Sequence, residues 1–155
     1  MANEDELAHR ALQWIEDTND PKALRKIAEN ARQAGREDVR ESALRKLYAV
    51  SPEAEIGTLE HDVWQSIYAL EGALTEERGK TTRLARTRQK IARDGERDTV
   101  VDLIKKSASE GYRMLVDRGW PELTFEAVAL RHPQRFESGT LSAAKVRLRN
   151  SGISD

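Results

Sequence analysis

The sequence predicts an all-α protein, a compact multi-helix bundle with an N-terminal helical-hairpin segment. Apolar residues recur at spacings of three and four along most of the chain, which is the period of an amphipathic helix. The pairs Asp20-Pro21 and Ser51-Pro52 are helix-start signals, each a capping residue followed by a favoured first-turn proline. Hydrophobic residues make up 38% and aromatic residues only 5%, a balance typical of small helical proteins that pack Leu and Ala.

Three short amphipathic helices joined by tight turns are predicted in residues 1–50. The first covers residues 4–17, because Asn3 is a favoured N-cap and Glu6 stands at the position of its capping-box partner. The second begins at Pro21 and is closed by Gly35. The third buries a side made of Val39, Ala43, Leu44 and Leu47. These helices are similar to a helical-hairpin array, but no residue-level repeat names a repeat family, and an ordinary bundle is the simpler interpretation.

Residues 51–155 begin with the longest periodic segment, which we expect to start at Ser51-Pro52. Its apolar residues are spaced by three and four: Ile56, Leu59, Val63, Ile67, Leu70 and Leu74. This seam extends for under three heptads, which favours packing within the chain over a dimer zipper. Gly79 breaks or kinks the helix. The two halves are expected to form one integrated domain.

Four shorter helical segments follow Gly79. Asp94-Gly95 supplies a stop for the first of them, and Pro133 disfavours helix at His132. The segments are a basic helix capped by Thr81 or Thr82 and ending near residue 93, a helix that holds Val100 and Ile104, a helix from Thr124 to about 132, and a last helix over about 140–150. No segment has the alternating pattern of a strand.

A strongly basic segment lies between Arg78 and Arg97. It holds eight basic and two acidic residues, net +6, whereas the whole chain is −1, so the other residues sum to −7. A basic segment of this kind usually binds phosphate groups. Four of its cations are spaced by three, four and three residues and would form one stripe on a helix: Arg83, Arg86, Lys90 and Arg93. Leu84 and Ile91 would lie on a different face of that helix. The predicted nucleic-acid-binding residues are Arg83, Arg86, Arg88, Lys90 and Arg93.

The predicted partner of this stripe is the backbone of duplex DNA. Arg predominates over Lys, which suits forked hydrogen bonding to phosphate, and the absence of aromatic residues from 78–97 argues against a single-strand platform. Two alternatives stay open: the stripe pairs with the protein's own Glu-rich helices, or it binds an acidic protein or a membrane surface. A second DNA-binding candidate is the closing pair of helices, although its proline-bearing connection is longer than that of a helix-turn-helix. The last helix carries Lys145, Arg147 and Arg149.

Hydrolysis of a phosphodiester usually requires a divalent ion held by clustered carboxylates. Asp98 and Asp102, one helical turn apart beside the basic helix, are the candidate Mg²⁺ ligands. The alternative is that Asp98 caps a helix and Asp102 is solvated. Glu122 and Glu126 are also four apart, but Glu122 is interpreted as a first-turn acid favoured by the helix dipole. No catalytic residue is assigned.

The remaining chemistry-bearing residues exclude several function classes. Cysteine is absent, which excludes disulfides, zinc–thiolate sites and cysteine nucleophiles and is compatible with a reducing cytosol. A phosphate-binding glycine loop is missing, so ATP hydrolysis is not supported. The histidines show no metal-binding spacing, and the adjacent His61 and Asp62 do not face each other on a helix, so we interpret the histidines as structural or solvated. They are His9, His61 and His132.

Three runs, TTRLARTRQKI at 81–91, RGWPELT at 118–124 and LRHP at 130–133, carry a resemblance to known proteins. They resemble small alphaproteobacterial hypothetical proteins and, among these, a DNA-damage-associated DNA endonuclease. The likeness covers about residues 60 to 150. It implies metal-dependent DNA cleavage in the cytoplasm, and it maps no catalytic residue onto this chain.

The acidic start, residues 1–6, is not that of a signal peptide, and no window approaches the length of a membrane span, so a cytoplasmic protein is expected. The sequence therefore predicts a protein that binds duplex DNA, with Mg²⁺-dependent endonuclease activity as an extension. The alternative is a helical adaptor or structural protein that binds an acidic protein partner.

Overall fold

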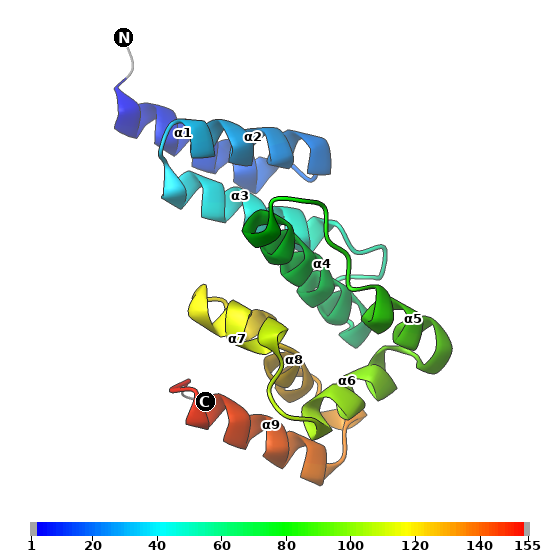
Figure 1. Cartoon of the computed structure of the whole chain (residues 1–155). Coiled ribbons are helices and arrows are strands. Elements are labelled where there is room, and N and C mark those ends of the chain that lie inside the picture. The colour runs from blue at the N-terminus through cyan, green and yellow to red at the C-terminus, as the bar shows by residue number, and fades with distance from the viewer. Residues whose placement is uncertain (1–2, 154–155) are drawn as a thin grey trace. The chain divides into compact units, whose positions relative to one another are not determined.

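The computed structural model describes residues 3–153, and all regular structure within that range is helical (Figure 1). The predicted all-α class is confirmed. The chain divides into two compact units, residues 1–52 and residues 53–155. Met1 and Ala2 of the acidic start lie outside the described residues. None of the described helices is long and apolar enough to cross a membrane.

The first unit consists of three helices, α1 (Glu4–Asp17), α2 (Pro21–Gln33) and α3 (Glu37–Val50). Both predicted caps are present: Asn3 Oδ1 accepts from the Glu6 N–H at 2.8 Å, and Asp20 Oδ1 accepts from the Lys22 N–H at 3.0 Å. These side chains satisfy amides that a helix start leaves without partners. Both α1 and α2 pack on α3. Local signals thus account for the starts of α1 and α2.

An apolar groove of about 520 Å³ crosses the first unit. All three of its helices contribute lining residues, among them Ala8, Ile27 and Val39. Leu7 and Trp14 also line it and remain more than half exposed. The unit therefore keeps a large apolar area of α1 beside an open groove.

The second unit is built around a long helix, α4, whose apolar seam lies in the interior. Helices α4, α6 and α8 contact one another, and α9 packs on α6 and α8, around a core that includes Val63, Ile67 and Val128. From Leu59 to Leu74 the seam therefore packs within the chain, as predicted, but its predicted first residue, Ile56, precedes α4 and is 80% exposed. The helices are α4 (Leu59–Arg78), α5 (Ala85–Asp94), α6 (Glu96–Lys105), α7 (Glu110–Asp117), α8 (Phe125–Arg131) and α9 (Ser138–Asn150), with short 3₁₀ turns η1 (Pro121–Leu123) and η2 (Pro133–Arg135).

The predicted start of α4 at Ser51-Pro52 is wrong. The Ser51 hydroxyl donates back to the Leu47 carbonyl at 2.6 Å, so Ser51 belongs to the end of α3. Gly57 has a φ of 93°, which a helix cannot include. The helix begins after Thr58, whose Oγ1 accepts from the His61 N–H at 3.1 Å. At its other end α4 stops at Gly79, in the left-handed conformation, as predicted.

Candidate functional site

The basic segment of residues 78–97 spans the end of α4, a connection and all of α5. Helix α5 begins at Ala85, so the predicted cap at Thr81 or Thr82 is wrong and Arg83 precedes the helix. The cause is a pair of hydrogen bonds to α4. The Thr82 N–H donates to Thr75 Oγ1 and the Leu84 N–H donates to Glu71 Oε2, each at 2.9 Å. These bonds hold residues 82–84 outside a helix, so the predicted four-cation stripe is not one helical face.

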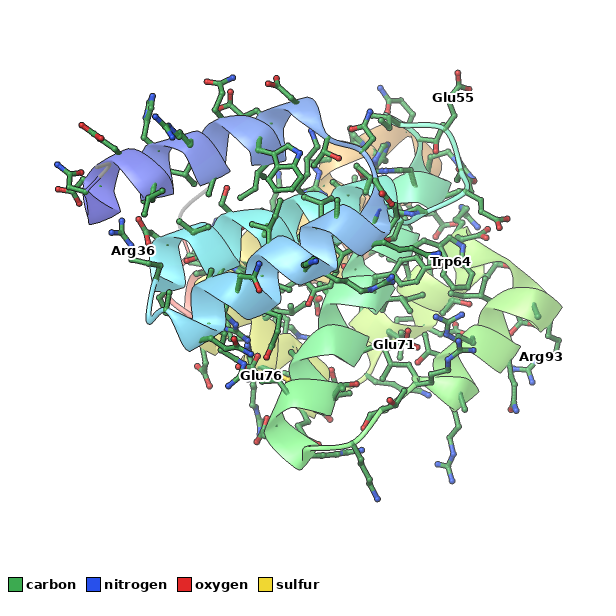
Figure 2. All side chains as sticks on the ribbon, turned by 90° about the horizontal axis from the view of Figure 1, so that it is seen from above. Arg36, Glu55, Trp64, Glu71, Glu76 and Arg93 are labelled. Atoms are coloured by element: carbon green, nitrogen blue, oxygen red, sulfur yellow. The ribbon has the colours of Figure 1, made fainter. Side chains whose placement is uncertain are left out.

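Arg88 is turned into the protein rather than toward solvent. Its Nε and Nη2 both lie 2.7 Å from the Glu71 carboxylate, and its guanidinium lies 5.2 Å from the Trp64 ring centroid and 5.7 Å from that of Tyr68. Glu71 and Trp64 both belong to α4 (Figure 2). The hydrogen bonds to Glu71 raise the pKa of Arg88. Arg88 therefore has a structural partner and is not positioned to meet phosphate.

Lys90 and Arg93 carry their own counter-charges. Lys90 Nζ lies 2.6 Å from Asp102 and 3.4 Å from Asp94, and the hydrogen bond to Asp102 is the main cause of the raised pKa of Lys90. Arg93 pairs with Asp94 at 3.2 Å, although 68% of its side chain is exposed and it points away from the body of the unit (Figure 2). This end of α5 therefore pairs within the protein, but with aspartates of α5 and α6 and not with the Glu-rich helices that the alternative named.

Four cations of the basic segment are exposed and have no acidic partner among the described residues: Arg78, Lys80, Arg83 and Arg86. They follow one another over the last residue of α4, the connection and the first turn of α5. We call them the cationic segment, residues 78–86. It retains Arg83 and Arg86 from the predicted site and adds Arg78 and Lys80, which the helical-stripe argument left out. Unpaired cations that are near neighbours along the chain repel one another, and a bound anion would reduce this repulsion.

The predicted Mg²⁺ ligands, Asp98 and Asp102, are both paired with cations of the protein. Asp98 lies 2.9 Å from Arg97, and Asp102 lies 2.6 Å from Lys90, which lowers the pKa of Asp102. Within residues 3–153, no three histidine, aspartate or glutamate side chains gather in a way that could hold a metal ion. The alternative that Asp98 caps a helix is wrong, because α6 is capped by Gly95, whereas Asp102 is partly solvated as that alternative expected, with 45% of its side chain exposed.

Arg147, one of the cations predicted on the last helix, points into the protein in the helix pair α8 and α9. Thr124 caps α8 as predicted, accepting from the Ala127 N–H at 3.1 Å. Arg147 of α9 lies 2.5 Å from Glu126, a residue only 5% exposed, and donates to the Ile104 carbonyl at 3.0 Å and to the Lys106 carbonyl. A carboxylate buried to this degree requires such a partner. The helix-turn-helix candidate thus loses Arg147 as a DNA contact.

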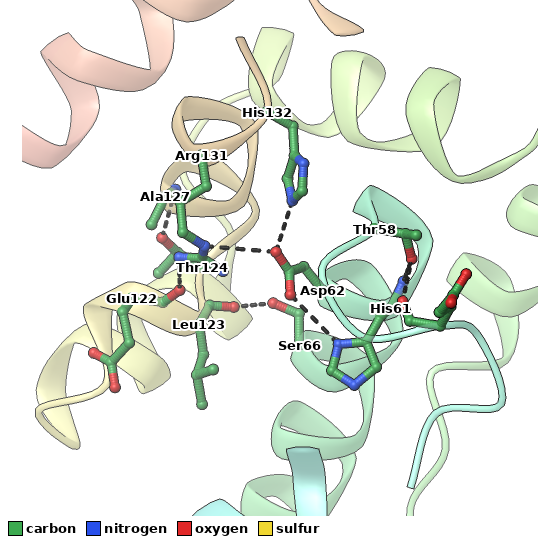
Figure 3. A network of polar contacts seen from close by, with 11 residues as sticks. Thr58, His61, Asp62, Ser66, Glu122, Leu123, Thr124, Ala127, Arg131 and His132 are labelled. Atoms are coloured by element: carbon green, nitrogen blue, oxygen red, sulfur yellow. Dashed lines mark hydrogen bonds and ion pairs between the residues drawn. The ribbon is translucent and has the colours of Figure 1, made fainter. Parts of the chain in front are cut away.

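A polar network joins α4 to the end of α8 (Figure 3). Asp62 Oδ2 lies 2.7 Å from His132 Nε2 and 3.6 Å from Arg131 Nε, and Asp62 Oδ1 lies 3.5 Å from the buried His61. Burial alone would raise the pKa of Asp62, but the hydrogen bond from His132 and the charge of Arg131 outweigh it and lower that pKa. The nearby Ser66 hydroxyl donates to the Leu123 carbonyl. Because the Ser66 hydroxyl is bonded to this backbone carbonyl, it does not join Asp62 and His132 in a catalytic arrangement. We interpret the network as a structural link between α4 and α8.

Sequence reasoning missed this network because its two sides are 70 residues apart. The expectation that His61 and Asp62 do not face each other needs one refinement, since their side chains approach to 3.5 Å. The only local signal was Pro133, which places His132 at a helix end.

Comparisons with known proteins add no functional assignment. No protein-family model matches the chain, and searches of curated proteins and of solved structures found no match.

Proposed function

We propose that this protein binds the phosphate backbone of duplex DNA through the cationic segment, residues 78–86. The observation that carries the proposal is that Arg78, Lys80, Arg83 and Arg86 have no acidic partner among the described residues, whereas Arg88, Lys90 and Arg93 have partners. Guanidinium groups present forked donors that match phosphate oxygens. Three of the four cations are arginines.

The charge balance of the chain indicates that DNA is attracted by a local group of cations and not by the net charge of the protein. The whole chain is net −1, so the molecule as a whole does not attract DNA. At physiological ionic strength the field of a charge is screened over about 8 Å. Attraction therefore has to come from cations that lie close together without counter-charges, which describes the cationic segment.

The proposal is confined to binding. Phosphodiester cleavage in the way predicted from the sequence requires a carboxylate-held metal ion. Asp98 and Asp102 are instead paired with Arg97 and Lys90. The proposal therefore assigns no cleavage role to Asp98 or Asp102.

The experiment compares two triple variants that remove equal charge. Arg78→Ala/Arg83→Ala/Arg86→Ala alters the cationic segment. Its matched control, Lys22→Ala/Arg25→Ala/Lys26→Ala, removes three exposed cations of α2 that also have no acidic partner among the described residues. Fluorescence anisotropy with a labelled blunt 20-base-pair duplex at low salt measures affinity.

We expect the first variant to bind about tenfold or more weakly than the wild-type protein and the control to change by less than about threefold, because phosphate contacts dominate such binding. Equal losses in the two variants would show that net charge alone acts. No binding by the wild-type protein would refute the proposal.

The adaptor alternative is supported by a separate observation in the first unit. Leu7 and Trp14 are more than half exposed beside the apolar groove of α1, α2 and α3. A function that depended on this groove would be lost in a Leu7→Ser/Trp14→Ser variant. Binding of DNA by the cationic segment would be unchanged in that variant.

A further inference from the structure

A cavity of about 570 Å³ lies within the second unit, directly beside the cationic segment. Three of the four cations of that segment, Arg78, Arg83 and Arg86, line it. Lys106, in the connection between α6 and α7, adds a fourth cation, which is exposed and has no acidic partner among the described residues. Arg147, Glu110 and Glu126 also line this cavity, which we call the α5–α7 cavity, so its lining holds five cations and two acids and suits a phosphate group.

Part of the lining of the cavity is apolar. Leu70 and Leu74 of α4, Leu115 of α7 and Phe125 of α8 contribute side chains, and the Tyr112 ring also lines the space. A purely inorganic anion would leave this surface uncovered. The wall instead suits a flat apolar body attached to the anion, since a ligand gains by covering apolar surface and by packing against aromatic rings.

Glu126 gives the cavity a buried acceptor. It is 5% exposed and lines the cavity, and its Oε2 is held by Arg147. Its Oε1 accepts no hydrogen bond from any described residue. Because no fully buried side-chain oxygen of the described residues lacks a partner, Oε1 must reach solvent, and the cavity is the space that Glu126 lines. A ligand that fills the cavity without offering a donor there would strip this carboxylate of water at a cost.

We infer that the α5–α7 cavity binds a nucleoside monophosphate unit. The phosphate lies against Arg83 and Arg86, the base packs on the apolar wall, and a base N–H donates to Glu126 Oε1. The cavity volume lies within the range of small-molecule sites, about 300–1,000 Å³. A fatty acid shares the anion and the apolar body but has no donor for Glu126. The inference deepens the proposed function, because the unit is either a free nucleotide or an unpaired terminal nucleotide of a bound DNA strand.

Isothermal titration calorimetry of the full chain with dCMP tests the inference, with 2-deoxyribose 5-phosphate as the ligand that lacks a base. We expect dCMP to bind about tenfold or more tightly than the sugar phosphate, because the base adds apolar contact and a donor to a charged acceptor. Glu126→Gln should weaken dCMP binding about fivefold or more and leave the sugar phosphate unaffected. Equal affinity of the two ligands would overturn the inference.

Two tryptophan variants keep the test independent of any folding defect in Glu126→Gln. Ser107→Trp places a large ring at a cavity-lining position in the α6–α7 connection, whereas Gln89→Trp places one on the exposed surface of α5 outside the cavity. Neither side chain makes a hydrogen bond in the described part of the chain. Ser107→Trp should abolish dCMP binding and Gln89→Trp should retain it. Retention of dCMP binding by both variants would refute the cavity as the site.

Further arms separate this inference from the proposed function and distinguish the two sources of the nucleotide. Lys80 belongs to the cationic segment but does not line the cavity, so Lys80→Ala should weaken blunt duplex binding and leave dCMP affinity unchanged. If the source is a strand end, a duplex with one unpaired, 5′-phosphorylated nucleotide should bind wild type more tightly than Ser107→Trp, and a blunt duplex should not. Duplex binding without dCMP binding would refute the cavity inference alone. Binding of dCMP without duplex binding would refute the DNA proposal and leave the free nucleotide as the ligand.

Discussion

Two arginines of α5 show how much the position of a single residue decides. Arg86 and Arg88 are two residues apart, and successive helical residues turn by about 100 degrees, so the two side chains leave the helix on nearly opposite faces. Arg88 meets Glu71 of α4, whereas Arg86 is exposed and lines the α5–α7 cavity. A count of cations along the sequence gives both the same weight. The structure assigns one to the packing of α4 and α5 and the other to a surface that can meet an anion.

Asp62 gives a prediction about pH at the residue scale. The folded protein holds the pKa of Asp62 below its ordinary value, whereas in the unfolded chain the value is about 3.9. The unfolded chain therefore takes up the proton more readily. The stabilisation is complete well above that value, and it is lost as the pH falls through the unfolded value toward the folded pKa.

We expect Asp62→Asn to reduce the free energy of unfolding by about 1 to 3 kcal/mol at pH 7, the range for hydrogen bonds to charged groups. The difference between variant and wild type should shrink steadily below about pH 4. Urea unfolding followed by circular dichroism at several pH values measures it. A difference that stays constant down to pH 3 would contradict the role given to the carboxylate charge.

At the scale of elements, the Glu71–Arg88 pair links α5 to α4. Glu71 is 8% exposed and accepts from Leu84 as well as from Arg88, so one carboxylate fixes both the start of α5 and its packing. Removing Arg88 leaves the buried Glu71 carboxylate without its bidentate partner, and an uncompensated charge in a partly desolvated site reduces the free energy of unfolding.

Arg88→Met is therefore expected to reduce the free energy of unfolding by about 2 kcal/mol or more. The matched substitution Arg86→Met, on the exposed face of the same helix, is expected to change it by less than about 0.5 kcal/mol. DNA affinity should respond in the opposite order. Chemical denaturation and fluorescence anisotropy of the two variants provide the measurements, and equal destabilisation of both would disprove the assigned orientations.

The elements also show which features a sequence can and cannot predict. The starts of α1 and α2 were predicted because each is set by a side chain within three residues of the amide it caps. The start of α5 was not, because Leu84 is held by Glu71, 13 residues earlier, on another helix. Local patterns contain no information on such a tertiary contact. The start of α4 is also set locally, by Thr58 after Gly57, whereas the prediction rested on the cap-plus-proline pair Ser51-Pro52.

The candidate site follows the same division. The basic composition of residues 78–97 was visible in the sequence, and Arg83 and Arg86 stay in the cationic segment. Which cations are neutralised depends on Glu71 and Asp102, and which oxygen lines the cavity depends on how Arg147 holds Glu126. These pairings are set by the packing of helices that lie far apart in the chain.

At the scale of the whole molecule, the salt dependence of DNA binding should report how many cations act. Each phosphate neutralised by a protein cation contributes about −0.9 to the slope of log K against log salt concentration on duplex DNA. If all four cations of the cationic segment contact phosphates, the slope for the wild-type protein is about −3.6. A chain that is net −1 offers no general attraction that would steepen it.

The triple variant Arg78→Ala/Arg83→Ala/Arg86→Ala keeps only Lys80 of the cationic segment, so its slope should fall to about −0.9. The α2 control variant, with equal net charge, should keep the wild-type slope. Affinities measured between 50 and 200 mM salt, a range over which counterion release is clearly resolved, supply both slopes. Because the two variants differ in where charge is lost and not in how much, a slope reduced equally in both would mean that DNA responds to total charge. A reduction confined to the first would mean that the exposed cations between α4 and α5 are the ones that meet phosphate.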